Sequence, residues 1–539
     1  MVLAAVVLAT HLIAGPTDSL SAAEWRGDLR RLVAEIERIH PNPYHRIPKA
    51  RFDGAVAALD ASIPSLSREQ IIVEFAKLVA LLGDGHTYLA PTSAESGANF
   101  GSYPVVYYQF TDGLYVQGTD SASAALLGGR VKRIGRLTAD QAMDTVGALV
   151  SRENPMWVRR WTPPLLARPE VLRALGIADN QGRVVITIER GGRDTTVELR
   201  PSTLGRPNGA GGLIWGERWR RVLPTRTPLW LRHPDAAFWL EHLRDSRTLY
   251  VQFNQIADAD TESVADFFQR VARFARGRPV DRFVLDLRLN GGGDNTLNAG
   301  VIRAVLGSAT LSRPDRFFTL IGPTTFSAAQ NLANALERYT NTIFIGEPTG
   351  SRPNMYGDAV PVTLPRSGLT FHVSTVWWQD LDPRDRRQWT GPAIAAAASA
   401  DEFRKGRDPA LAAALAYNPR QALTARLRAP LVKGDLAEAM RAYQSFIADS
   451  AHRYVDTERE LEALAISLAR DGKLPGAAAV AELNAREHPQ SPQAQYVLGE
   501  AFRRRGNPTA AAEAYQRALA LDPRHAGALQ GMREVRPAS

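Results

Sequence analysis

The stretch FVLDLRLNGGG, residues 283–293, decides the fold of this chain. Its first five residues are apolar except for Asp286, and the run is bounded by Asn290 and three glycines. A short apolar run before such a boundary predicts a covered strand that ends in a loop. The glycines leave the backbone of that loop exposed, so it can offer free N–H groups to a ligand.

The stretch FFTLIGPTTFSAAQNLANALE, residues 317–337, repeats this plan with a strand, a turn and a helix. Ser327 stands where the helix begins. Helix N-termini have unpaired amides and a favourable dipole, so they stabilise developing negative charge. Ser327 is therefore a candidate nucleophile, and the alternative is a purely structural N-cap serine.

Three motifs in order, DLRLNGGG at 286–293, TTFSAAQ at 324–330 and IGEPTG at 345–350, resemble the catalytic core of the C-terminal processing (tail-specific) serine peptidases and the related tricorn core. The resemblance covers roughly residues 249–416. It implies an α/β multidomain protein with a crotonase/ClpP-like peptidase core. It also implies hydrolysis of peptide bonds through an acyl-enzyme on Ser327.

The base that activates the serine differs within this family. Processing peptidases use a Lys after the serine helix, but here Arg352 stands twenty-five residues after Ser327, and no Lys occurs between Lys132 and Lys405. Because Arg stays protonated in proteins, it cannot serve as a base. Tricorn-like members use a His from the N-terminal helical region, which implies that role for His86.

The local sequence around His86 is consistent with a functional His, because the motif LLGDGHTYL at 81–89 places it in a glycine-containing loop. His372 is the competing base. It stands inside FHVSTV, residues 371–376, where strand alternation favours a structural role.

The resemblance places the acid that orients His86 in the loop after Trp378. Asp380 is preferred there, while Asp382, Asp385 and Glu347 remain open. The oxyanion hole needs two N–H donors. We expect them from the glycine turn, at Gly292 and Gly293, and from the amide of Ala328. Asp286 and Arg288 are expected to brace the turn, and no motif indicates a metal, nucleotide or flavin cofactor.

The rest of the chain divides by pattern into further segments. Apolar residues at helical spacing predict a helical domain, and alternating strands and helices resemble a PDZ module whose insertion spans residues 153–179. A 34-residue repeat predicts at least two tetratricopeptide units. The expected boundaries are a signal-like segment at 1–22, a helical domain at 23–100, a PDZ-like domain at 101–204, a linker or lid at 205–245, the peptidase core at 246–417 and the repeats at 430–539.

Composition limits the kinds of binding partner and the cellular compartment that we expect for this protein. The formal charge is +9, but the positive residues are scattered, which disfavours nucleic-acid binding. The chain has no Cys, so packing alone must hold the fold. Residues 2–14 are mostly apolar and too short for a transmembrane helix, which favours export to the periplasm or the extracellular space over a cytoplasmic location.

Two functions follow as hypotheses. The first is a serine peptidase acting on peptides or proteins. The second is a binding protein on the same fold that holds an apolar ligand or a peptide without turnover. In either case the C-terminal repeats are expected to bind a protein partner or to mediate self-association.

Overall fold

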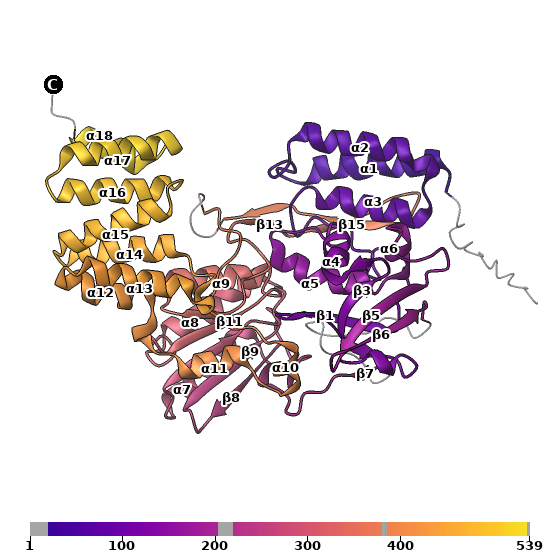
Figure 1. The fold of residues 1–539 in the computed structure, drawn as a ribbon, viewed down its shortest axis with the longest axis horizontal. Coiled ribbons are helices and arrows are strands. Elements are labelled where there is room, and N and C mark those ends of the chain that lie inside the picture. Colours follow the sequence, from indigo (N-terminus) through magenta and orange to yellow (C-terminus); the bar gives the residue numbers. More distant parts are fainter. Residues whose placement is uncertain (1–19, 203–218, 380–382, 384, 536–539) are drawn as a thin grey trace, which may run out of the picture.

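The computed structural model describes residues 20–202, 219–379, 383 and 385–535. The signal-like residues 2–14 lie outside this range, as do Asp380 and Asp382. The N-terminal helices and a β-rich region lie at one side of the molecule, a central domain follows, and the C-terminal helices form a stack at the other side (Figure 1).

A six-stranded sheet forms the core, in the order β17-β12-β11-β10-β9-β8. Five strands run parallel and β8 pairs antiparallel with β9, so the sheet is mainly parallel. The strands are β8 (Phe238–Leu243), β9 (Thr248–Phe253), β10 (Arg282–Asp286), β11 (Phe317–Ile321), β12 (Ile343–Gly346) and β17 (Ile394–Ala395).

Strand β8 lies inside the segment that the sequence suggested was a linker or lid. Phe238 and Leu240 pack against the core on one face of the sheet, whereas Trp239 and Leu243 pack against the core on the other. This two-residue alternation is the period of a strand. The Gly-, Pro- and Trp-rich surroundings of β8 concealed it in the sequence.

Helices cover both faces of the sheet. Side chains of β11 show the division, because Phe317 and Ile321 join one buried cluster while Phe318 and Leu320 join the other. Burying each such side chain stabilises the fold by roughly 1.5–3 kcal/mol. The first cluster is closed by α7 (Val264–Arg276), α8 (Asn298–Leu306) and α9 (Ala328–Tyr339), and the second by α11 (Pro409–Ala416).

The N-terminal helices confirm the predicted helical region. Ser21 and Ser67 each open a helix with a reciprocal capping box, and the apolar stripe of the first helix, including Trp25, Leu29 and Ile36, is buried. The helices are α1 (Ala22–Ile39), α2 (Lys49–Ser62) and α3 (Arg68–Ala80).

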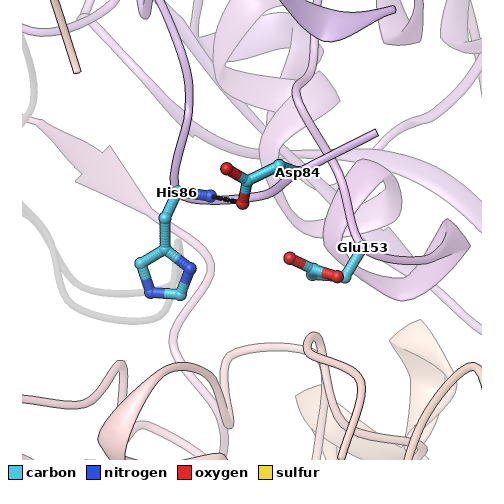
Figure 2. A group of neighbouring side chains, drawn as sticks. All are labelled: Asp84, His86 and Glu153. Atoms are coloured by element: carbon cyan, nitrogen blue, oxygen red, sulfur yellow. Dashed lines mark hydrogen bonds between the residues drawn. The ribbon is translucent and has the colours of Figure 1, made fainter. Parts of the chain in front are cut away.

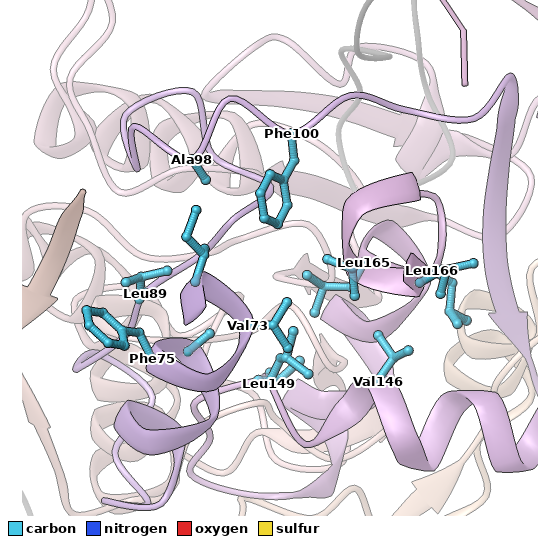
Figure 3. Packing of buried hydrophobic residues seen from close by; sticks show 14 of the residues in the cluster. Val73, Phe75, Leu89, Ala98, Phe100, Val146, Leu149, Leu165 and Leu166 are labelled. Atoms are coloured by element: carbon cyan, nitrogen blue, oxygen red, sulfur yellow. The ribbon is translucent and has the colours of Figure 1, made fainter. Parts of the chain in front are cut away.

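An antiparallel seven-stranded sheet follows these helices and shares their hydrophobic core. Side chains from α3, from residues 89–100 and from α4 and α5 meet in this core (Figure 3). The elements are β1 (Val105–Phe110), β2 (Gly113–Thr119), β3 (Arg130–Ile134), β4 (Leu137–Thr138), α4 (Ala139–Gly147), α5 (Pro155–Leu166), α6 (Pro169–Ala174), β5 (Val184–Arg190), β6 (Arg193–Leu199) and β7 (Arg220–Arg221). The PDZ-type identity of this region stays a prediction.

A hairpin that follows α9 in the sequence lies outside the core sheet. It packs against the hydrophobic cluster that the N-terminal helices share with the antiparallel sheet. It consists of β14 (Val360–Thr363) and β15 (Thr370–Val373), and it buries Phe371 and Val373 in that cluster. An antiparallel bridge joins its His372 to Tyr88, two residues after His86. The hairpin therefore holds the loop that carries His86 against this hydrophobic cluster.

The C-terminal region forms a stack of antiparallel helices with its own buried clusters. Contacts with the core are present: Arg459 pairs with Glu337 on α9 at 3.1 Å, and Tyr454 packs edge-on against Trp389. The helices are α12 (Leu423–Lys433), α13 (Leu436–Ala448), α14 (Thr457–Arg470), α15 (Leu474–Glu487), α16 (Pro492–Arg504), α17 (Pro508–Leu521) and α18 (Ala526–Val535). Among the described helices, none combines the length and apolarity needed to cross a membrane.

Candidate active site

Ser327 lies between β11 and α9 in a conformation that serine rarely adopts. Its φ is 56° and its ψ is −128°, and its side chain makes no capping hydrogen bond to the helix. Its amide donates to Ser351 Oγ at 3.2 Å, which fixes the turn. Strain of this kind costs about 1–3 kcal/mol and clusters at functional sites. The geometry therefore favours a functional serine over a structural cap, as in other strained strand-to-helix turns that expose a nucleophile.

The glycine turn lies directly against Ser327. A Cβ on Gly292 would lie 2.7 Å from the Ser327 Cβ and 3.0 Å from the amide nitrogen of Ala328, and the φ of Gly292 is 109°. Its amide, however, donates to Asn290 Oδ1 at 2.9 Å. Among the described residues, no group accepts a hydrogen bond from the amides of Gly293 and Ala328. Gly292 thus supplies space beside the serine, while the other two offer unused donors.

His86 extends from the loop after α3 and reaches the same turn. Its imidazole stacks on the ring of Phe326, the residue before Ser327, with centroids 4.3 Å apart and planes 23° apart. Phe326 also stacks on Trp157 of α5, with ring centroids 3.8 Å apart. The structure therefore brings two sequence-predicted residues, His86 and Ser327, into one site.

The imidazole of His86 is buried, and neither ring nitrogen has a hydrogen-bond partner among the described residues. Burial lowers the pKa of His86 below its ordinary value, although the charges of Asp84 and Asp358 and the nearby backbone of Tyr356 act in the opposite direction. His86 is consequently neutral at pH 7, with one nitrogen available to accept a proton.

Asp84 holds the loop that presents His86. It accepts hydrogen bonds from the ring of His40 at 3.1 Å, from the Ser374 hydroxyl at 2.6 Å and from the His86 backbone amide at 2.9 Å. Burial favours a raised pKa for Asp84, but the His40 hydrogen bond, the attraction to His86 in its protonated form and the Ser374 hydrogen bond outweigh burial, so this pKa is lowered. Asp84 is therefore an anion beside the imidazole.

Glu153 completes a buried group with Asp84 and His86 (Figure 2). One ligand-type atom from each of the three residues lies within 4.8 Å of the others. Glu153 Oε1 accepts the Gly85 amide at 3.1 Å. Burial, and then the charge of Asp84, raise the pKa of Glu153 to about 8. At neutral pH Glu153 is therefore mostly protonated, whereas Asp84 is ionised.

The same group is the place in the described chain where three His, Asp or Glu side chains converge closely enough to hold a metal ion. A nitrogen and two carboxylate oxygens form a donor set that zinc accepts. Both carboxylates, however, already accept hydrogen bonds from protein groups. These hydrogen bonds therefore support the loop that carries His86.

The structure describes two of the four acids proposed from the sequence, and both of these pair with arginines away from His86. Asp380 and Asp382 belong to the residues that the structure does not describe, so their role stays a prediction. Asp385 pairs with Arg387 at 2.8 Å, and Glu347 pairs with Arg159. Those two carboxylates are committed to arginines.

Glu153 is the residue that sequence reasoning missed. It stands at the start of the insertion in the PDZ-like region, and nothing in its local sequence indicates contact with the His86 loop. Asp84 had a local signal, since it precedes His86 by two residues in a glycine-flanked loop. Arg288 pairs with Asp286 at 2.6 Å and with Asp408 at 2.8 Å, so the two residues join the end of β10 to the start of α11, and their bracing of the glycine turn stays a prediction.

Comparisons with known proteins agree with this fold. A tetratricopeptide repeat model matches residues 492–532, which confirms the predicted repeats. Among curated proteins, no sequence matches the chain. The structure of mature CPAF complexed with lactacystin is similar at 12% identity, with a TM-score of 0.51, and the match covers 72% of this chain and 96% of that one.

Two further structures are also similar to this chain. A CPAF variant is 14% identical with a TM-score of 0.50, covering 72% of this chain and 95% of the other. The photosystem II D1 C-terminal processing protease is 14% identical with a TM-score of 0.35, covering 72% and 98%. The two CPAF structures share the overall fold of this chain, and the predicted α/β multidomain fold is confirmed.

Proposed function

We propose that this chain is a serine peptidase in which Ser327 is the nucleophile and His86 is the general base. The observation that carries the proposal is the contact between the two segments. A neutral, buried imidazole with unpartnered nitrogens stacks on the residue that precedes a backbone-strained serine. Nucleophile, base and unused amides therefore lie in one place, as an acyl-transfer site requires.

The reaction follows from these positions. His86 accepts the proton of the Ser327 hydroxyl while the serine oxygen attacks the carbonyl carbon of a peptide bond. The carbonyl oxygen takes up the negative charge, and the amides of Gly293 and Ala328 donate hydrogen bonds to it. The imidazolium then returns the proton to the leaving amine, and water hydrolyses the acyl-enzyme with His86 again acting as base.

The carboxyl groups near His86 support the charge that develops on it. Asp84 is anionic and attracts the imidazolium, so it stabilises the transition state. Glu153 is buried and largely protonated, so it can donate a hydrogen bond as well as accept one. Asp380 remains the sequence-based candidate for the orienting acid, at a position that the structure does not describe.

The substrates in this proposal are peptides or proteins. The C-terminal repeats are proposed to recruit a protein partner or a second copy of the chain, as such repeats commonly do. Export remains a proposal from residues 2–14.

A fluorophosphonate probe tests the function directly. We expect covalent labelling of wild-type protein, no labelling of Ser327→Ala, and a modified peptide that contains Ser327 by mass spectrometry. Because CPAF has been solved with lactacystin, lactacystin is a second reagent, and adduct formation is read from the intact mass. Absence of labelling with both reagents in folded protein would reject the peptidase and favour a binding protein on this fold.

A further inference from the structure

Asp84, His86 and Glu153 form a buried group that lacks a basic partner for its two acids (Figure 2). One nitrogen or oxygen atom from each side chain lies within 4.8 Å of those from the other two. Among the described residues, no Lys or Arg lies within ion-pair distance of either carboxyl group, and Asp84 has only the His40 ring, at 3.1 Å. Buried acids without a cation are costly, and a bound metal ion would offset that cost.

The imidazole of His86 is an independent indication of a ligand. The side chain is only 9% exposed, and neither ring nitrogen has a hydrogen-bond partner in the described part of the chain. Buried polar groups in proteins nearly always have such a partner. A ring nitrogen within 4.8 Å of two carboxyl oxygens is therefore placed to bind a metal ion together with them.

The hydrogen bonds of the two acids are those expected of metal-binding carboxylates. Asp84 Oδ2 accepts from the His40 ring and from the Ser374 hydroxyl, and Glu153 Oε1 accepts from the Gly85 amide. Each carboxylate oxygen has two lone pairs, and Glu153 Oε2 has no hydrogen bond with described residues, so lone pairs remain for a metal. Hydrogen bonds from a second layer of groups orient the ligands in metal sites.

Gly85 allows the three side chains to approach one another. A Cβ at this position would lie 3.2 Å from Cγ of Glu153 and 3.0 Å from the ring of Phe326. Because Gly85 has no side chain, Glu153 can come up to the loop between Asp84 and His86.

We propose that Asp84, His86 and Glu153 bind a zinc ion and that bound zinc inhibits the peptidase. One imidazole nitrogen and two carboxylate oxygens are a donor set that zinc accepts, with a fourth position left for water. Mg²⁺ prefers oxygen ligands in an octahedron, so this site should discriminate against it. Zinc displaces the proton that Glu153 holds in the metal-free protein.

The inhibition follows from the chemistry of a neutral imidazole. Only one of its nitrogens has a free lone pair, and the other carries the hydrogen. Zinc takes that lone pair, so neither nitrogen can accept the proton of Ser327, whichever of the two binds the metal. The inhibition rests on the proposed role of His86 as the base, whereas the zinc site itself does not.

Isothermal titration calorimetry with ZnCl₂ tests the site in full-length Ser327→Ala protein that has been freed of metal with EDTA and dialysed. We expect one zinc ion per chain, bound at least about a hundredfold more tightly than Mg²⁺. Adding Glu153→Gln should weaken zinc binding at least about tenfold, because an amide replaces an anionic ligand. Adding Glu513→Gln, at an exposed position of α17, should leave it unchanged.

Cobalt(II) provides a second measurement in which the three ligands stay intact. Bound Co²⁺ with few ligands should absorb visible light more strongly than aqueous Co²⁺, since geometry is diagnostic for such ions. One equivalent of zinc should remove this absorption. If circular dichroism shows that Glu153→Gln is unfolded, the cobalt titration decides whether the site exists.

Inhibition is measured as the rate of fluorophosphonate labelling of wild-type protein at increasing zinc. Saturating zinc should lower the rate at least about a hundredfold, the contribution of a general base, and EDTA should restore it. Half-maximal inhibition should occur at the Kd from calorimetry. Glu153→Gln should raise the zinc concentration needed by the factor by which it weakens binding.

The outcomes separate this inference from the proposed function. Absence of saturable zinc binding and of the cobalt absorption, or zinc binding that a folded Glu153→Gln variant leaves unchanged, overturns the zinc site. Zinc binding that does not slow labelling overturns the inhibition. If metal-free wild-type protein is not labelled while zinc binding depends on Glu153, the peptidase proposal fails and the zinc site stands.

Discussion

The imidazole of His86 lies nearly parallel to the ring of Phe326, with the centroids 4.3 Å apart, and Phe326 immediately precedes Ser327. This contact joins an N-terminal loop to the turn between β11 and α9. The hairpin β14–β15 secures it, because Ser374 directly after the hairpin donates to Asp84 at 2.6 Å. The candidate base is thus placed by packing between two domains.

Replacing His86 by Ala should lower the rate of fluorophosphonate labelling by several orders of magnitude, because the serine loses its base while the oxyanion donors remain. The measurement is the second-order labelling rate at fixed pH. His372→Ala is the control, since this side chain stacks on Tyr88 at 4.7 Å and should have little effect. Near-normal labelling of His86→Ala would remove His86 from the mechanism.

The pH dependence of labelling should reflect the lowered pKa of His86. A base must be deprotonated to act, so the rate falls when the pH drops below that pKa. Burial lowers the pKa from the ordinary 6.5, so activity should persist at pH values below those expected for an exposed His. A pH–rate profile measures this directly. An acidic limb centred above pH 6.5 would contradict the environment described for His86.

Gly292→Ala should abolish labelling, because the added Cβ would lie 2.7 Å from the Ser327 Cβ and the backbone has a φ of 109°. The added Cβ would displace Ser327 and the amide of Ala328, so we expect a loss of at least about a hundredfold, the size of loss that follows removal of one oxyanion donor. Gly291→Ala is a matched control in the same turn, since nothing lies within 4 Å of the added Cβ. If both variants labelled equally well, the glycine turn would not border the reacting serine.

Glu153→Gln should change how stability depends on pH. The folded-state pKa of Glu153 is raised to about 8 from 4.5, so its stabilising effect is complete below pH 4.5 and is lost as the pH rises through 8. The amide cannot ionise, so the Tm of the variant relative to wild type should rise between pH 5 and pH 9. The effect on the free energy of unfolding should be on the order of a few kcal/mol.

The matched control is Glu513→Gln at an exposed position of α17, measured at the same pH values. A constant Tm difference for Glu153→Gln across this range would show that Glu153 is ionised in the folded protein.

Truncation after Tyr417 should leave labelling of Ser327 intact, because the repeats form their own buried clusters and can be removed without opening the core sheet. The contacts of Arg459 and Tyr454 with the core should make the truncated protein somewhat less stable. Labelling and size-exclusion chromatography test activity and assembly together. Arg459→Ala, which removes one ion pair, serves as the mild comparison.

If the truncated protein is insoluble while Arg459→Ala is normal, the repeats belong to the packing of the core. The domain boundary expected near residue 417 would then be wrong.

The sequence by itself determined the local features of this protein. The apolar run at 283–287 before three glycines specified a buried strand and a turn, and the serine after the second strand specified a helix start. The 34-residue period specified the repeats, which the match at 492–532 confirms. These signals are readable because strands, turns and helices are encoded over a few residues.

Only the tertiary structure decided how the site is assembled. Glu153, Asp84 and Ser374 come from three distant segments, and their meeting depends on the packing of the N-terminal cluster with the β14–β15 hairpin. Side-chain partners across domains depend on burial and orientation, and no short stretch of sequence encodes these properties.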